Sequence, residues 1–211
     1  MLSLALSALM LATPAAADPC HPRGSRTLVE NREARIYLAR GGDPLGYGDG
    51  VRACSFHYGR RVRLASPDTE QIRAPLVANR RWVVFSRSYI CDGSGCLWEV
   101  AERSLRTGRL RFDEINGGTE TCDVGGDCGL YAVGKLLLRP DGVVAWIACD
   151  GDAELDYSEC IERPYYLLVR DHRGVRDLDK GRIRVRSLHF THHKRRIAWT
   201  NRGVRHSARL R

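Results

Sequence analysis

A short pattern that recurs four times along the chain constrains the fold more than any other feature of the sequence. Each copy places a small or β-branched residue directly before an aromatic one. The copies read RIYL at 35–38, VVFS at 83–86, VAWI at 144–147 and IAWT at 197–200. The aromatic positions lie 48, 61 and 53 residues apart, a spacing typical of stacked β-units. The pattern predicts an architecture and carries no chemistry of its own.

Short apolar runs punctuated by turn residues surround each copy and predict antiparallel meanders. In the first two repeats the strands are expected at 27–30, 34–39, 51–56 and 61–65, then at 71–78, 81–87, 97–104 and 109–113. In the last two they are expected at 136–139, 143–148 and 165–171, then at 183–190, 196–200 and 204–210. The last repeat lacks a fourth strand.

A Gly-Arg turn precedes the last strand in two repeats, as Gly59-Arg60 and Gly108-Arg109. Glycine at this place allows a positive φ. Together with the apolar pairs that end in an aromatic residue, this turn resembles the loose class of secreted bacterial β-propeller-like repeat proteins, over residues 27–211. The resemblance implies an all-β fold of about four antiparallel blades, the last incomplete, and it carries over no catalytic residue. A β-sandwich or an open array of sheets fits the same strands.

Residues 1–17 have the features of a secretory signal peptide. An apolar run at 2–12 is followed by Thr13-Pro14 and by three alanines before Asp18. The run is too short to span a bilayer, which needs about 20 residues. We therefore expect a single β-propeller-like domain at 18–211, secreted or extracytoplasmic, with no transmembrane segment.

Cysteine usage agrees with export, because all eight cysteines follow the expected cleavage site. They are Cys20, Cys54, Cys91, Cys96, Cys122, Cys128, Cys149 and Cys160. An even number in an exported chain predicts disulfides, and spacing favours three local pairs that leave the first two cysteines to bond each other. Sequence alone leaves the other connectivities open. A zinc site is the rival reading, but the spacings are not those of paired C-x2-C knuckles.

Charge is distributed very unevenly along the chain. The net charge is +9, and residues 181–211 contain ten Arg or Lys and no carboxylate. Residues 113–162 contain twelve carboxylates and two basic residues. The excess of positive charge therefore belongs to the last repeat.

The basic last repeat is the predicted binding surface. Arg182, Arg184 and Arg186 alternate with apolar residues, so on a strand their side chains would share one face. Arginine binds phosphate and carboxylate groups in a bidentate manner. The candidate residues are Arg182, Arg184, Arg186, Arg195, Arg196, Arg202 and Arg205. We expect an anionic envelope polymer or another exported protein as the partner, and not a nucleic acid. The alternative is a solvated face that protects a sheet edge.

Two further clusters invite a metal interpretation. Asp150, Asp152, Glu154 and Asp156 alternate like calcium ligands, but the loop lacks the glycine and the terminal Glu of an EF-hand. Calcium is therefore a weak expectation, and a solvated loop is the alternative. His189, His192 and His193 lie in a cationic segment that would repel a divalent ion, so turn and strand roles explain them better.

Two classes of function are compatible with the sequence. A non-catalytic binding or scaffold protein is favoured, because the chain has no G-x-S-x-G or H-E-x-x-H motif and no catalytic residue can be named. The alternative is a propeller-based hydrolase or lyase whose carboxylates converge only in space.

Overall fold

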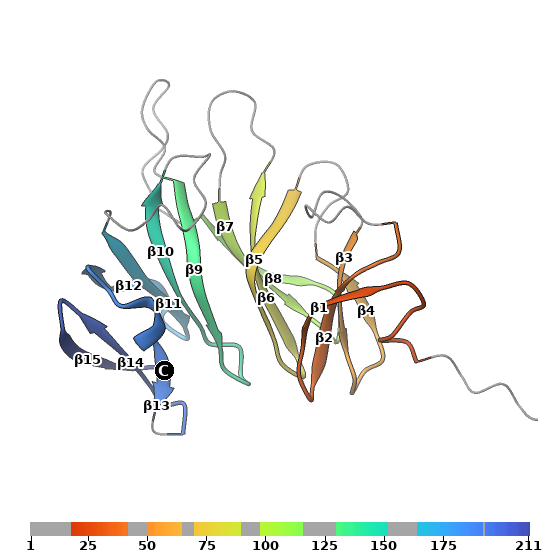
Figure 1. The fold of residues 1–211 in the computed structure, drawn as a ribbon. Helices are drawn as coiled ribbons and strands as arrows, with labels where there is room; N and C mark the ends of the chain where they lie inside the picture. The colour runs from red at the N-terminus through yellow and green to blue at the C-terminus, as the bar shows by residue number, and fades with distance from the viewer. Residues whose placement is uncertain are drawn as a thin grey trace, which may run out of the picture.

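The computed structural model describes residues 18–41, 50–64, 70–89, 98–115, 130–151, 164–191 and 193–211 of the 211-residue chain. These residues form four antiparallel β-sheets that lie side by side in chain order (Figure 1). The first and last sheets lie at opposite ends of the stack. Helix is confined in the described ranges to single short turns, so the all-β prediction is confirmed.

Each of the first two sheets contains four strands that neighbour one another in chain order. The first sheet comprises β1 (Arg26–Glu30), β2 (Ala34–Leu38), β3 (Val51–Ser55) and β4 (Arg61–Arg63). The second comprises β5 (Glu70–Ala78), β6 (Trp82–Tyr89), β7 (Trp98–Ser104) and β8 (Leu110–Ile115). The Gly-Arg turns lie where they were predicted, with φ of +61° at Gly59 and +76° at Gly108.

The third sheet repeats this order, and the fourth stops one strand short. The third comprises β9 (Leu130–Leu138), β10 (Val144–Gly151), β11 (Tyr165–Asp171) and β12 (Gly174–Gly181). The fourth comprises β13 (His189–Thr191), β14 (Arg196–Asn201) and β15 (Val204–Arg209). The recurring sequence pattern falls on the second strand of every sheet.

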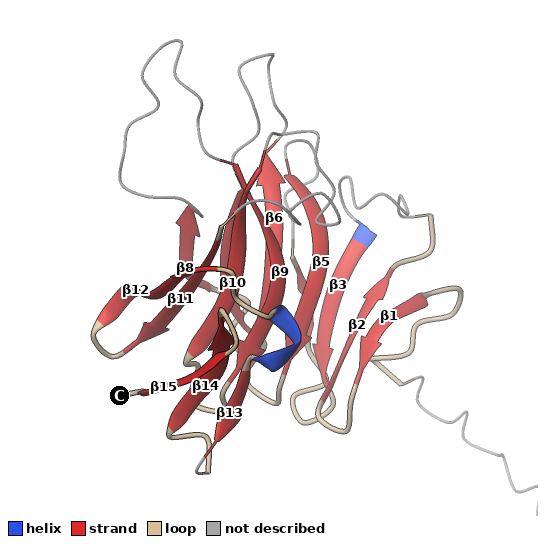
Figure 2. Ribbon diagram, turned by 60° about the vertical axis from the view of Figure 1, so that its left-hand side comes forward, coloured by secondary structure: helices blue, strands red, loops and turns tan. Residues whose placement is uncertain are grey.

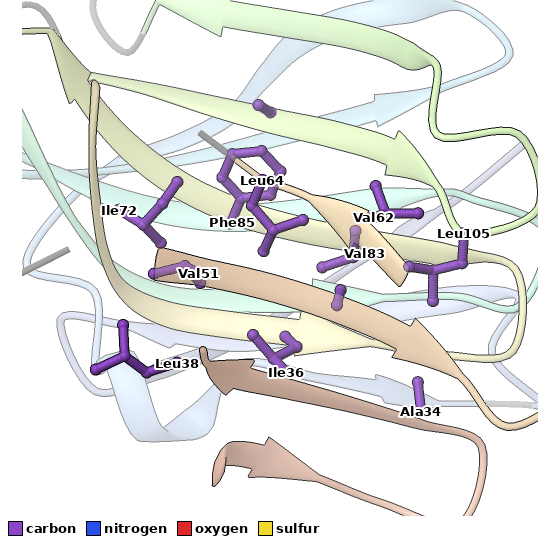
Figure 3. Close-up of a cluster of buried hydrophobic side chains, with 12 residues drawn as sticks. Ala34, Ile36, Leu38, Val51, Val62, Leu64, Ile72, Val83, Phe85 and Leu105 are labelled. Atoms are coloured by element: carbon purple, nitrogen blue, oxygen red, sulfur yellow. The ribbon is translucent and has the colours of Figure 1, made fainter. Parts of the chain in front are cut away.

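The first and second sheets pack face to face through apolar side chains. Ile36 and Val51 of the first sheet contact Val83 and Phe85 of the second, and all four are buried (Figure 3). Removing a side chain of this size from water stabilises the fold by about 2 kcal/mol. The interface is therefore a continuous core between two repeats.

The two inner sheets are buried on both faces, which explains the runs of consecutive apolar residues in their second strands, at 83–85 and 144–148. Val84, next to Val83, points to the opposite face and joins Trp146 in the core between the second and third sheets. Ile147, next to Trp146, joins Ile197 in the core between the third and fourth sheets. A strand with two buried faces needs apolar residues at consecutive positions.

Closure into a propeller stays a prediction. Each of the three large apolar clusters joins sheets that are neighbours in the chain, and none in the described residues joins the first sheet to the last. The described helices include none long and apolar enough to cross a membrane.

The predicted strand at 183–190 is wrong. Ile183 forms only an isolated bridge to Asn201, a 3-10 helix, η3 (Val185–Ser187), follows, and β13 is three residues long. The cause is local, because both the amide and the hydroxyl of Ser187 donate to the carbonyl of Arg184. A serine that bonds the backbone three residues earlier favours a turn over an extended strand.

One predicted disulfide is confirmed, with Cys20 bonded to Cys54. Cys149 is also disulfide-bonded, and no cysteine in the described ranges is free. The predicted pairs Cys91–Cys96 and Cys122–Cys128 lie outside the described residues, as does Cys160, the predicted partner of Cys149.

Candidate functional site

The last sheet has one face turned toward the third sheet. Burial alternates along β14, with Ile197, Trp199 and Asn201 buried. The Trp199 Nε1–H donates to Asp179 of β12 at 2.5 Å, and the Asn201 Nδ2–H donates to the other carboxylate oxygen at 2.9 Å. Apolar burial and these two hydrogen bonds fix the last sheet against its neighbour.

The opposite face of the last sheet carries a row of arginines. Arg205, Ser207 and Arg209 alternate on β15 and pair with the three partly buried positions of β14 that face away from the core. Arg196, directly across from Arg209, donates to the Ser207 hydroxyl at 2.6 Å. The row therefore runs along β15 on the face that points away from the third sheet.

A groove of about 680 Å³ lies over one end of this sheet and is called here the η3 groove. Several cationic or titratable side chains line it, and no Asp or Glu does. They are Lys135, Arg184, Arg186, His189, Arg205 and His206. The hydroxyl-bearing residues Ser187, Thr191 and Thr200 and the apolar residues Leu188, Ala198 and Trp199 complete the wall.

The 3-10 turn η3 builds the wall of this groove. Figure 2 shows η3 as the blue segment beside β9 and the last sheet. The Ser187 hydroxyl accepts a hydrogen bond from the Thr200 amide at 2.8 Å, and the Arg184 amide donates to the Thr200 carbonyl at 2.8 Å. These bonds tie η3 to β14 and bring Arg184 and Arg186 to the groove.

Lys135 reaches the η3 groove from the third sheet. Its ammonium donates to the carbonyl of Arg186 at 3.3 Å, and burial lowers the pKa of the Lys135 side chain. In the described part of the chain, neither Lys135 nor the groove's arginines have a carboxylate partner. Gathering cations without counter-charge raises the local positive potential, which favours the binding of an anion.

A second groove of about 580 Å³, called here the turn groove, lies at the other end of β14. The turns before β10 and β14 and the end of the chain supply its lining. Its charged residues are Arg139, Asp141, Lys194, Arg195, Arg209 and Arg211. Arg139 holds the carboxylate of Asp141 in two hydrogen bonds, of 2.7 and 2.5 Å, so this acid is already neutralised. The remaining cations give the turn groove a positive charge.

The structure divides the predicted binding residues among different places. Arg184, Arg186 and Arg205 line the η3 groove, and Arg195 lines the turn groove. Arg196 lies between the grooves on the outer face of the sheet. The expectation that residues 182, 184 and 186 share one strand face is wrong, because η3 interrupts the segment.

Arg182 and Arg202 line neither groove. The Arg202 amide donates to the Arg182 carbonyl at 3.2 Å, and Arg202 has a φ of +48° in the turn between β14 and β15. This backbone contact joins the start of the last repeat to its final hairpin. The two residues therefore have a place in the turn structure and not in the grooves.

Sequence reasoning missed several basic residues of the two grooves, which are Lys135, Arg139, Lys194, His206, Arg209 and Arg211. Arg209 completes an Arg-x-Ser-x-Arg alternation on β15 that is readable in the sequence. Lys135 carries no such signal, because only the packing of the third sheet on the fourth brings it to residues about fifty positions later. Residues from two repeats thus form the η3 groove.

The predicted metal residues are not brought together in the described parts of the chain. Asp150 lies on β10, and Asp152, Glu154 and Asp156 lie outside the described residues. His189 lines the η3 groove and His193 the turn groove, while His192 is also outside. Within the described ranges, no group of three or more potential ligands is close enough to hold a metal ion.

The buried carboxylates of the described residues are engaged by arginines and line neither groove. Glu99 pairs with Arg87, and Asp171 pairs with Arg176 at 2.6 Å. The fully buried Glu102 lies between two guanidinium groups at the interface of the second and third sheets, and its burial raises the pKa to about 7. Glu102 therefore links the second and third sheets, whereas Glu99 and Asp171 form ion pairs within a single sheet.

Comparison with known proteins adds no relative to this description. No protein-family model, no curated protein and no solved structure matches the chain.

Proposed function

We propose that this protein is a non-catalytic binding module that works outside the cytoplasm and engages an anionic envelope polymer through its last sheet. The observation that carries the proposal is the η3 groove, where Lys135 and three arginines converge without a carboxylate. The expected signal peptide and the Cys20–Cys54 disulfide support an extracytoplasmic location.

The charge of the site favours an anion on physical grounds. Positive side chains that face a common groove repel one another, and a bound anion relieves that repulsion. Buried arginines elsewhere in the described chain pair with carboxylates, as Arg87 does with Glu99, whereas Arg184, Arg186 and Arg205 are exposed and form no described ion pair. The groove's lack of acids therefore distinguishes it from the structural arginines.

The form of the site favours a polymer that presents hydroxyls as well as negative charge. Thr191 and Thr200 line the groove beside the cations. Trp199 also lines it but is only 5% exposed, so the described last sheet offers no row of exposed aromatic rings on which bases would stack. Val204 is the large apolar residue that this sheet exposes most. An anionic polysaccharide fits this surface better than a nucleic acid.

The test is binding to immobilised polygalacturonate over a series of salt concentrations. The variant Arg184→Gln/Arg186→Gln/Arg205→Gln removes three groove cations. At about 0.7 kcal/mol per contact, it should weaken binding by about thirtyfold. Wild-type affinity should fall steeply as salt rises, because exposed charges are screened.

A matched control removes the same number of charges from turns of the other three sheets. Arg32, Arg106 and Arg173 are exposed and line neither groove. The variant Arg32→Gln/Arg106→Gln/Arg173→Gln should keep the wild-type affinity within about twofold. Equal losses in the two variants would show nonspecific attraction by net charge and would contradict the proposal.

A further inference from the structure

The cations of the last sheet extend beyond a single groove. The η3 groove lies near Thr200 and Arg205, whereas the turn groove lies near Arg195 and Arg209. These residues belong to opposite ends of the β14–β15 hairpin, because Thr200 pairs with Arg205 and Arg196 pairs with Arg209. The two positive grooves therefore lie at the two ends of one β-hairpin.

The outer face of β15 contributes one arginine to each groove, Arg205 to the η3 groove and Arg209 to the turn groove. Arg205 and Arg209 are four residues apart, which corresponds to about 13 Å along a strand. Ser207 lies between them on the same face, with the Arg196 guanidinium bonded to its hydroxyl. No carboxylate interrupts this described path, because β14 and β15 contain none.

We propose that the ligand is a linear, carboxylate-bearing polysaccharide that runs along β15 and occupies the η3 groove and the turn groove at the same time. This inference rests on the proposed function and specifies its ligand. The alternation of cation, hydroxyl and cation along β15 complements a chain that presents carboxylates separated by sugar hydroxyls. A small anion would fill one groove and gain nothing from the other.

Length dependence is the direct consequence of this arrangement. When a chain is already bound in one groove, its next segment meets the other groove at a high effective concentration. Affinity should therefore rise sharply once an oligomer is long enough to reach both grooves. Below that length, an oligomer can occupy only one groove at a time.

The experiment measures the binding of galacturonate oligomers, from a disaccharide to a dodecasaccharide, by titration calorimetry. For the wild-type protein the dodecasaccharide should bind about a hundredfold more tightly than the disaccharide. The variant Arg195→Gln/Arg209→Gln removes two cations from the turn groove and should lose most of this gain. The pair Arg32→Gln/Arg106→Gln is the charge-matched control and should keep the gain.

The outcomes separate this inference from the proposed function. Tight binding that does not depend on length, or a length gain that survives in Arg195→Gln/Arg209→Gln, would overturn the two-groove path and leave anion binding intact. Absence of binding by every oligomer would overturn both. Stronger binding of polyphosphate than of a galacturonate oligomer with equal charge would overturn the polysaccharide assignment. Circular dichroism of each variant checks that the sheets are retained.

Discussion

The first and last sheets use arginine on their outer faces for opposite purposes. On the first sheet, Arg35 is 4% exposed and lies beneath the segment that precedes β1. On the last sheet, Arg205 and Arg209 are exposed. The strand order of the two sheets is the same as far as the last sheet extends. The difference is a covering segment, which the first sheet has and which the described residues do not supply to the last sheet.

The side chain of Arg35 anchors the segment that covers the first sheet through hydrogen bonds. The Arg35 guanidinium donates to the Cys20 carbonyl at 2.7 Å, to the Ser25 hydroxyl at 3.0 Å and to the Thr27 hydroxyl at 2.9 Å. It lies 4.9 Å from the centre of the buried Tyr37 ring. A covered arginine with its donors satisfied by the protein stabilises the fold, whereas an uncovered one is available to a ligand.

The largest expected effect comes from removing the disulfide that anchors the cover. Cys20 and Cys54 are 34 residues apart, and the double variant Cys20→Ala/Cys54→Ala should lower the free energy of unfolding by about 3 to 4 kcal/mol. Urea denaturation measures the change. Polymer binding by the folded variant should stay unchanged, since the last sheet is untouched. A loss below about 1 kcal/mol would show that the cover is held by its other contacts.

The core carboxylate Glu102 gives an intermediate effect that depends on pH. Burial raises the pKa of Glu102 to about 7, although Arg111 and Arg170 lie 3.3 and 3.0 Å away. The pKa is higher in the folded than in the unfolded chain, so this group's contribution to stability is present below about pH 4.5 and is lost as the pH rises through about 7.

The variant Glu102→Gln cannot titrate and isolates this contribution. Between about pH 4.5 and pH 8, the wild type should lose up to about 3 kcal/mol of stability relative to the variant. Denaturation of both proteins across this range provides the measurement. A stability difference that is constant with pH would contradict the raised pKa. It would mean that the arginines keep Glu102 ionised throughout this range.

The smallest effect separates the two kinds of arginine directly. Arg35→Met leaves the carbonyl of Cys20 without its donor and should lower the free energy of unfolding by about 2 kcal/mol. Arg205→Met should change it by less than about 0.5 kcal/mol, because the side chain is exposed. Polygalacturonate binding should weaken in Arg205→Met and stay unchanged in Arg35→Met. Similar losses of stability in the two variants would remove the distinction between the sheets.

The sequence was sufficient to locate the strands because their signals are local. Every copy of the recurring pattern lies on the second strand of a sheet, and its aromatic residue is buried in each case, as at Phe85 and Trp146. In the third repeat the prediction was incomplete, because β9 begins at Leu130 and not at residue 136, and β12 (Gly174–Gly181) was not predicted. The segment at 183–190 was predicted as one strand, and that prediction is wrong. Arginine alternates with apolar residues in this segment, which is the pattern of a strand. The structure has a turn instead, because Ser187 forms two hydrogen bonds with the carbonyl of Arg184.

The candidate site was only partly predictable because packing assembles it. The concentration of charge in the last repeat pointed to the correct sheet, and the alternation of Arg205 and Arg209 was visible in the sequence. The contribution of Lys135 depends on which face of β9 meets the last repeat, and on a turn that the strand prediction excluded. A single sequence contains no signal for which residues of different repeats lie close together in space.

In the described residues, each large core joins repeats that are adjacent in the chain. The stability of one sheet therefore depends mainly on its contacts with the neighbouring sheets. Among the described clusters, the inner sheets have a large apolar core on two sides, and the first and last sheets have one on a single side. The Cys20–Cys54 disulfide clamps the first sheet, so we expect the last sheet to have the lowest free energy of opening. A polymer bound across β14 and β15 would then stabilise the last sheet against local unfolding. The fraction of protein with bound polymer would therefore affect how readily the sheets open from this end.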